Sequence, residues 1–132
     1  MEQIYQELIL NAVQEKKSWK QLLEICKVET SSQKKQLKKV LSNLETLGYL
    51  YYNHEKMYQK FPEEYELDTI EMTKEGLKLK KHPEISPQEI KSTFVLLPKD
   101  IVVIEIKKDP NKNAFVHKIV QRDKETFVSY LL

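Results

Sequence analysis

The chain has 132 residues, enough for one ordinary domain or for two small ones with modest cores. Its 22 lysines and arginines stand against 20 aspartates and glutamates, and the net charge of only +2 excludes a general attraction to polyanions, so any basic surface must be local. A single cysteine excludes an intrachain disulfide and no apolar run reaches the roughly 18 residues of a membrane span, so we expect a cytoplasmic protein without membrane association.

Two short amphipathic helices are predicted at the start of the chain. Over residues 3–14 the apolar side chains recur at helical spacing and form one stripe, made by Ile4, Leu8, Ile9 and Ala12. Ser18 can accept hydrogen bonds from the backbone amides that open a second helix, whose apolar stripe is Trp19, Leu22, Leu23 and Cys26. Cys26 is therefore expected in the core, with a protonated and unreactive thiol.

A third helix follows three residues suited to capping, Thr30, Ser31 and Ser32. Its core side is predicted to comprise Leu37, Val40, Leu41, Leu44 and Leu47, and Gly48 stands where a left-handed residue ends many helices. At about 100° per residue the opposite side carries Lys35, Lys39, Ser42 and Thr46, with Lys38 on its shoulder. Residues 33–60 contain six lysines and two glutamates, so a local positive charge accompanies this helix.

A β-hairpin is predicted directly after Gly48. Its first strand covers residues 49–52, a polar turn covers residues 53–56, and residues 57–61 return before Pro62. Alternation along the strands should bury at least two of the four hairpin tyrosines against Leu41 and Leu44, which leaves Tyr49 or Tyr51 to stack on a base. Three helices and a hairpin over residues 1–62 describe a winged helix.

The second half of the chain, residues 67–132, is predicted to be a small antiparallel β-barrel. Short β-rich runs lie at residues 67–72, 77–79, 101–106, 115–120 and 127–132, and residues 87–90 predict a single helical turn. The acidic run EEYELD at residues 63–68 is interpreted as the joint between the two patterns. The predicted fold class is therefore α+β.

No group of residues predicts catalysis. Glu64, Glu66 and Asp68 alternate and would share one face of a strand, where they could hold a divalent metal, but a solvated strand is the preferred interpretation. The histidines at positions 54, 82 and 117 lack ligand spacing, and the two glycines form no phosphate-binding loop. We therefore assign no catalytic residue, metal or cofactor to the chain itself.

Several segments resemble the N-terminal region of the ribonuclease R family. Residues 44–64, LETLGYLYYNHEKMYQKFPEE, are similar to the end of the family's winged helix, with Asn53, Tyr58 and Pro62 at its Asn, Tyr and Pro positions. ISPQEI at residues 85–90 and KDIVVIEI at residues 99–106 resemble the IPPxxL and GDxVxV signatures of the family's first cold-shock barrel, and FVHKIVQRD at residues 115–123 resembles its next strand. The similarity covers most of residues 31–130 and implies an OB-like or cold-shock-like barrel.

The chain also departs from the family. The hairpin lacks the family's turn glycine and has one extra residue before Pro62, and Lys99 stands in place of another glycine. The family's Gly-Phe-Gly-Phe run, whose rings stack on bases, is replaced by GLKL at residues 76–79. We therefore expect this barrel to hold RNA by charge, through a local excess of three positive charges from Lys74, Lys78, Lys80 and Lys81 against Glu75.

The resemblance implies an RNA-binding N-terminal region of a 3′–5′ exoribonuclease, which captures or unwinds single-stranded or structured RNA for a catalytic domain. In that family the hydrolytic domain, which uses Mg²⁺, follows a second barrel, and nothing in these residues corresponds to it. The chain ends on TFVSYLL, which indicates either a fragment of a larger polypeptide continuing after residue 132, the interpretation we favour, or a small protein whose last strand completes the barrel. We expect a monomer that does not itself hydrolyse RNA.

The candidate nucleic-acid-binding residues are Lys35, Lys38, Lys39, Tyr49, Tyr51, Asn53, Lys56, Lys78 and Lys80. The lysines are assigned to phosphates, one of the two tyrosines to a base or sugar, and Asn53 with Lys56 to the hairpin turn. Three other interpretations remain open. The lysines form only a solvated helix face, the chain is a winged-helix regulator that reads duplex DNA as a dimer, or it is a protein-interaction module.

Overall fold

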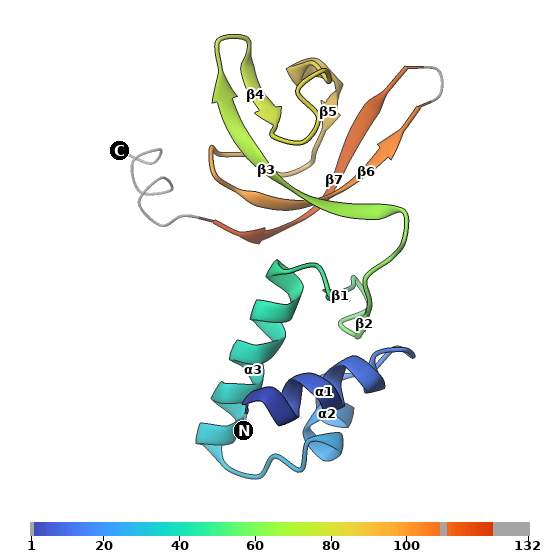
Figure 1. Cartoon of the computed structure of the whole chain (residues 1–132), viewed down its shortest axis with the longest axis vertical. Coiled ribbons are helices and arrows are strands. Elements are labelled where there is room, and N and C mark those ends of the chain that lie inside the picture. Colours follow the sequence, from blue (N-terminus) through green and yellow to red (C-terminus); the bar gives the residue numbers. More distant parts are fainter. Residues whose placement is uncertain (1, 109–110, 123–132) are drawn as a thin grey trace. The chain divides into compact units, whose positions relative to one another are not determined.

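A computed structural model describes residues 2–108 and 111–122, and it is an α+β protein (Figure 1). The chain divides into two compact units, residues 1–62 and residues 63–132, which we call unit 1 and unit 2. In the described residues, unit 1 contains three helices and a two-stranded sheet, and unit 2 contains five strands and one turn of 3₁₀ helix. The division between the two units falls directly after Pro62.

The helices of unit 1 are α1 (Glu2–Ala12), α2 (Trp19–Ile25) and α3 (Ser31–Thr46). Local hydrogen bonds define where α2 and α3 begin. Ser18 Oγ accepts from the Gln21 N–H at 3.1 Å, and Gln21 Oε1 accepts from the Ser18 N–H at 2.8 Å. Thr30 and Gln33 repeat this capping box at the start of α3. The predicted cap at Ser18 is confirmed, and Thr30 is the residue that caps α3.

Gly48 ends α3 in the left-handed conformation, with φ of 83°, as predicted. Its N–H donates to the Glu45 carbonyl at 3.1 Å, and the Tyr49 N–H donates to the Leu44 carbonyl at 2.9 Å, the two bonds of a Schellman motif. Leu47, predicted in the core, is 66% exposed. That prediction was wrong because Leu47 follows the last helical residue and lies at the edge of the apolar stripe.

The core of unit 1 joins the three helices to the hairpin, and its buried side chains are Tyr5, Ile9, Val13, Leu22, Cys26, Val28, Leu37, Val40, Leu41, Leu44 and Leu50. On α3 the predicted stripe from Leu37 to Leu44 is buried. On α1 the predicted Ile9 is buried, but the prediction was wrong for Ile4, which is 57% exposed, because Tyr5 at the next position is buried in its place. Adjacent helical positions differ by about 100°, so packing turned the buried side of α1 toward Tyr5.

Strands β1 (Leu50–Tyr52) and β2 (Tyr58–Lys60) form the predicted hairpin, with Tyr52 opposite Tyr58. Lys17, between α1 and α2, pairs with Tyr58 through two backbone hydrogen bonds of 2.8 and 2.7 Å. The Lys60 N–H also donates to the Val13 carbonyl at 2.9 Å. These backbone bonds fix the hairpin to the helices of unit 1.

In unit 2 the five described strands form a nearly closed, barrel-like sheet in the order β4-β3-β6-β7-β5 (Figure 1). The elements are β3 (Tyr65–Thr73), β4 (Gly76–Leu79), η1 (Pro87–Glu89), β5 (Ile90–Lys91), β6 (Ile101–Lys107) and β7 (Asn113–Gln121). The helical turn predicted over residues 87–90 is η1. The predicted strand at residues 127–132 lies outside the described residues.

One pairing in this sheet is parallel, because β5 runs beside β7 with Ile90 opposite Ala114. The prediction of an antiparallel barrel is therefore wrong at β5. A strand of two residues has no alternation that a sequence pattern could reveal. The core that the sheet encloses contains Ile70, Leu79, Ile85, Val102, Ile104, Ala114 and Val116.

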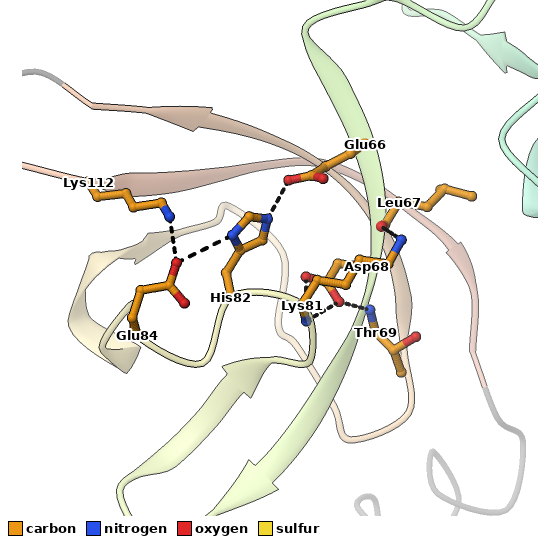
Figure 2. Close-up of polar contacts among 8 residues, drawn as sticks. All are labelled: Glu66, Leu67, Asp68, Thr69, Lys81, His82, Glu84 and Lys112. Atoms are coloured by element: carbon orange, nitrogen blue, oxygen red, sulfur yellow. Dashed lines mark hydrogen bonds and ion pairs between the residues drawn. The ribbon is translucent and has the colours of Figure 1, made fainter.

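The acidic run at residues 63–68 is partly structural. Tyr65 begins β3, and Asp68 is only 2% exposed. The Asp68 carboxylate accepts from the Thr69 N–H at 2.7 Å and from the Lys81 N–H at 3.1 Å (Figure 2). The interpretation of these acids as a solvated strand is therefore wrong at Asp68, which accepts from one backbone N–H of β3 and one of the turn after β4.

The turn before β6 contains a second buried acid. Lys99 adopts a left-handed φ of 73°, and Asp100 is fully buried behind it. The Asp100 carboxylate accepts from the Leu97 N–H at 2.9 Å and from Nε and Nη2 of Arg122 at 2.9 and 2.7 Å. Lysine therefore adopts the backbone shape that glycine would provide at this turn.

Candidate nucleic-acid interface

The exposed side of α3 carries a cluster of lysines, Lys34, Lys35, Lys38 and Lys39, which we call the basic face. None of the four forms an ion pair with a described residue, and α3 contains no acid before Glu45. Like charges lie four residues apart at 34/38 and 35/39, and each such pair destabilises an isolated helix by about 0.2–0.5 kcal/mol. A bound polyanion would relieve this repulsion.

Among the described residues, Lys38 is the lysine of the basic face that lies over an aromatic ring. Its Nζ lies 5.4 Å from the centroid of the Trp19 ring on α2. An exposed cation–π contact of this kind contributes about 0.5–1 kcal/mol. The contact positions the Lys38 ammonium while leaving the side chain exposed.

The hairpin tyrosines have different environments. Tyr49 is 58% exposed, as expected for one of the two stacking candidates. Tyr51 is half-buried and makes an edge contact with Phe61, with ring centroids 6.2 Å apart. Tyr58 packs against the core of unit 1, and burial raises its pKa to about 12. Of the tyrosines proposed for stacking, Tyr49 has the larger exposed surface.

Asn53 organises the hairpin turn. It is buried, and its Oδ1 accepts from the Glu55 and Met57 N–H groups at 2.9 and 3.1 Å. Its Nδ2 donates to Gln59 Oε1 at 2.7 Å. The structure thus gives Asn53 a turn-forming role, in which both polar atoms of its side chain bond within the hairpin.

Lys56 is the exposed cation of the hairpin turn, with a left-handed φ of 62°. The neighbouring Glu55 is paired with Lys16 at 2.7 Å, and this hydrogen bond lowers the pKa of the Glu55 carboxyl. Lys56 itself forms no ion pair with a described residue. The turn therefore presents one positive charge beyond its internal pairs.

Helix α3 and the hairpin line an open groove of about 440 Å³, which we call the α3–hairpin groove. Its lining residues are Lys38, Leu41, Ser42, Glu45, Tyr52 and Tyr58. Sequence reasoning missed Glu45, Tyr52 and Tyr58 as site residues. The sequence did contain a signal for them. Positions 38, 42 and 45 share one side of α3, and Tyr52 and Tyr58 are paired positions of the hairpin that follows.

On the barrel, internal contacts use part of the predicted positive charge. Lys78 has a side chain only 19% exposed, and its Nζ lies 3.6 Å from Glu75. The Lys81 Nζ donates to the Leu67 carbonyl at 2.8 Å. The predicted excess of three charges already counts Glu75 and therefore remains, and Lys74 and Lys80 are exposed without an ion pair to any described residue.

A polar cluster in unit 2 links β3 to two loops, as Figure 2 shows. His82 Nε2 contacts Glu66, and His82 Nδ1 lies 3.6 Å from Glu84, which also bonds Lys112. The Lys112 hydrogen bond lowers the pKa of Glu84 to about 2. His117 similarly bonds Glu105 at 3.0 Å and stacks on Tyr65. Both histidines therefore take part in structural contacts within unit 2.

The remaining candidates for chemistry are limited. Cys26 is buried, and burial raises the pKa of its thiol. Residues 2–108 and 111–122 contain no group of three or more His, Cys, Asp and Glu side chains arranged to hold a metal ion. In the same residues every helix is too short or too polar to cross a membrane.

Comparison of the chain with models of known protein families and with curated proteins finds no match.

Proposed function

We propose that the chain binds RNA through the basic face of α3 and the hairpin turn. The observation that carries the proposal is the set of four lysines on α3 that repel one another and form no ion pair with the described residues. Lysines in this arrangement would contact phosphates and position the strand without reading its sequence. Lys56 and Tyr49 would extend the contact along the hairpin, and Lys80 would add charge from the barrel.

The fold is compatible with this role. Three helices, a hairpin and a short third pairing at Lys17 are the elements of a winged helix, in which α3 would be the recognition helix. A nearly closed five-stranded barrel is the architecture of OB and cold-shock domains, which bind single-stranded nucleic acids. We therefore propose a winged helix followed by an OB-like barrel.

We further propose that this pair of units serves as the RNA-capturing region of a ribonuclease R-like 3′–5′ exoribonuclease. The support is the order of the similar segments: the segment that resembles GDxVxV covers most of β6, and the next similar segment overlaps β7. Hydrolysis and its Mg²⁺ would then belong to a catalytic domain, and this chain would supply only binding.

The salt dependence of binding tests the RNA proposal. On single strands the logarithm of affinity should fall with the logarithm of salt concentration by about 0.7 per neutralised phosphate. The double variant Lys35→Gln/Lys39→Gln should therefore flatten the slope by about 1.4 units. The matched control, Lys20→Gln/Lys108→Gln, removes two exposed charges outside α3 and should leave the slope unchanged.

An unchanged slope in the α3 variant would exclude the basic face as the contact. Competition between single-stranded RNA and duplex DNA, combined with sedimentation, distinguishes the RNA proposal from a DNA-binding regulator. A regulator would prefer one duplex and form a dimer. Absence of any nucleic-acid shift would refute the proposal and favour a protein-interaction module.

A further inference from the structure

The α3–hairpin groove is an open depression lined by polar and aromatic side chains. Its volume of about 440 Å³ lies within the usual range for small-molecule pockets. One wall comes from α3 and the other from the hairpin, and both belong to unit 1. The groove lies next to the basic face, because Lys38 lines the groove and is also part of the basic face.

The hairpin wall is aromatic and held in place. The rings of Tyr52 and Tyr58 lie 4.5 Å apart between centroids and are tilted by 41°. Tyr58 packs against the core of unit 1, while Glu45 Oε2 accepts from the Tyr52 N–H at 2.8 Å and ties β1 to α3. A flat ligand entering the groove would therefore meet a wall that needs little reordering.

The α3 wall supplies polar groups of complementary kinds. Ser42 presents an exposed hydroxyl, Glu45 a carboxylate, and Lys38 an ammonium oriented by the Trp19 ring. Burial keeps the pKa of Tyr58 at about 12, so its phenol stays neutral at physiological pH. An aromatic wall, a hydroxyl, a carboxylate and one cation match the face, the edge and the phosphate of a nucleotide.

We propose that this groove takes one unpaired nucleobase of an RNA strand whose phosphates lie along the basic face. The inference rests on the proposed function and specifies its ligand. Lys35 lies three and four residues before Lys38 and Lys39, and Ser42 follows these two by four and three residues, so a strand that follows the lysines passes the mouth of the groove. Because a duplex keeps its bases paired and stacked, the groove favours single strands over duplexes.

The test compares two strands that differ only in their bases. A labelled single-stranded oligouridine and an abasic ribose strand of the same length carry the same phosphates. Stacking contributes about 1–3 kcal/mol per base, which corresponds to about 5- to 150-fold in affinity, so wild type should bind oligouridine at least about fivefold tighter.

Matched variants on α3 then locate the base contact. Ser42→Gln fills the groove from an exposed helix position with a neutral side chain, and Asn43→Gln places the same side chain at the next exposed position, outside the groove lining. Ser42→Gln should remove the preference for oligouridine while leaving the affinity for the abasic strand unchanged. Asn43→Gln should retain the preference, and Tyr52→Leu, which removes one ring of the wall, should lose it.

The outcomes separate this inference from the proposed function. Equal wild-type affinity for the two strands, with normal salt dependence, overturns the groove and leaves RNA binding intact. A preference that survives in both Ser42→Gln and Tyr52→Leu places the base contact elsewhere and also overturns the groove. Failure to bind either strand overturns the proposed function itself.

Discussion

Replacing Lys56 by glycine should stabilise unit 1 and weaken RNA binding at the same time. Lys56 has a φ of 62°, and a residue with a Cβ atom adopts this left-handed conformation at a cost of about 1–2 kcal/mol. Its side chain is exposed, and its N–H donates to the Asn53 carbonyl at 3.1 Å, a bond that glycine can also form. The substitution therefore relieves strain without removing a described hydrogen bond.

The net gain is smaller than the strain. Glycine loses about 0.5–1 kcal/mol more backbone entropy on folding than residues with a side chain, so the free energy of unfolding should rise by about 0.5–1 kcal/mol. Urea unfolding followed by the fluorescence of Trp19, the single tryptophan of the chain, reports on unit 1. With an m-value of about 1 kcal/mol per molar, the midpoint should increase by about 0.5–1 M.

Lys56→Ala is the matched control, because it removes the same charge and keeps the strained backbone. Both variants should lose about 0.7 units of salt slope in RNA binding, and only the glycine variant should gain stability. Equal urea midpoints for the two variants would refute the strain argument. Slopes unchanged from wild type would remove Lys56 from the RNA contacts.

Two further predictions concern unit 2. Asp100→Ala leaves the Arg122 guanidinium without its buried partner and should destabilise unit 2 by about 3 kcal/mol, near the lower end for a broken buried pair because Arg122 is partly exposed. The midpoint of thermal unfolding followed by far-UV circular dichroism of the strands should fall, while the midpoint followed by Trp19 fluorescence should stay unchanged. An equal shift of both midpoints would contradict the separate cores. The folded-state pKa of Glu84, about 2, lies below the ordinary 4.5, so its stabilising contribution is complete above pH 4.5 and is lost as the pH falls toward 2. Lys112→Gln should make this acid-induced loss of thermal stability smaller, and an identical pH profile in wild type and variant would exclude the pair as its source.

Much of unit 1 could be predicted because its signals are local. A capping hydroxyl at Ser18, a helix-ending glycine at position 48 and an apolar stripe from Leu37 to Leu44 each act through residues within a few positions along the chain. Once that stripe is buried, the geometry of a helix requires the lysines of the basic face to lie on the exposed side. The main part of the candidate site therefore followed from periodicity.

Other features depend on which distant residues meet. Periodicity allowed two stripes on α1, and only packing against the other helices buried Tyr5 instead of Ile4. The burial of Asp68 depends on a backbone amide thirteen residues away, and that of Asp100 involves a guanidinium twenty-two residues away. Such pairings are set by chain topology, which no local pattern encodes.

The sequence by itself determined that this protein has three helices and a hairpin followed by a strand-rich half, and that one helix has a basic side. Only the tertiary structure decided which lysines are paired, since Lys78 lies beside Glu75 while the lysines of α3 form no ion pair with a described residue. It also brought Ser42 and Glu45 opposite Tyr52 and Tyr58 to form a groove. The physical reason is that helix and strand formation depends on neighbours in the chain, whereas charge neutralisation and cavity shape depend on neighbours in space.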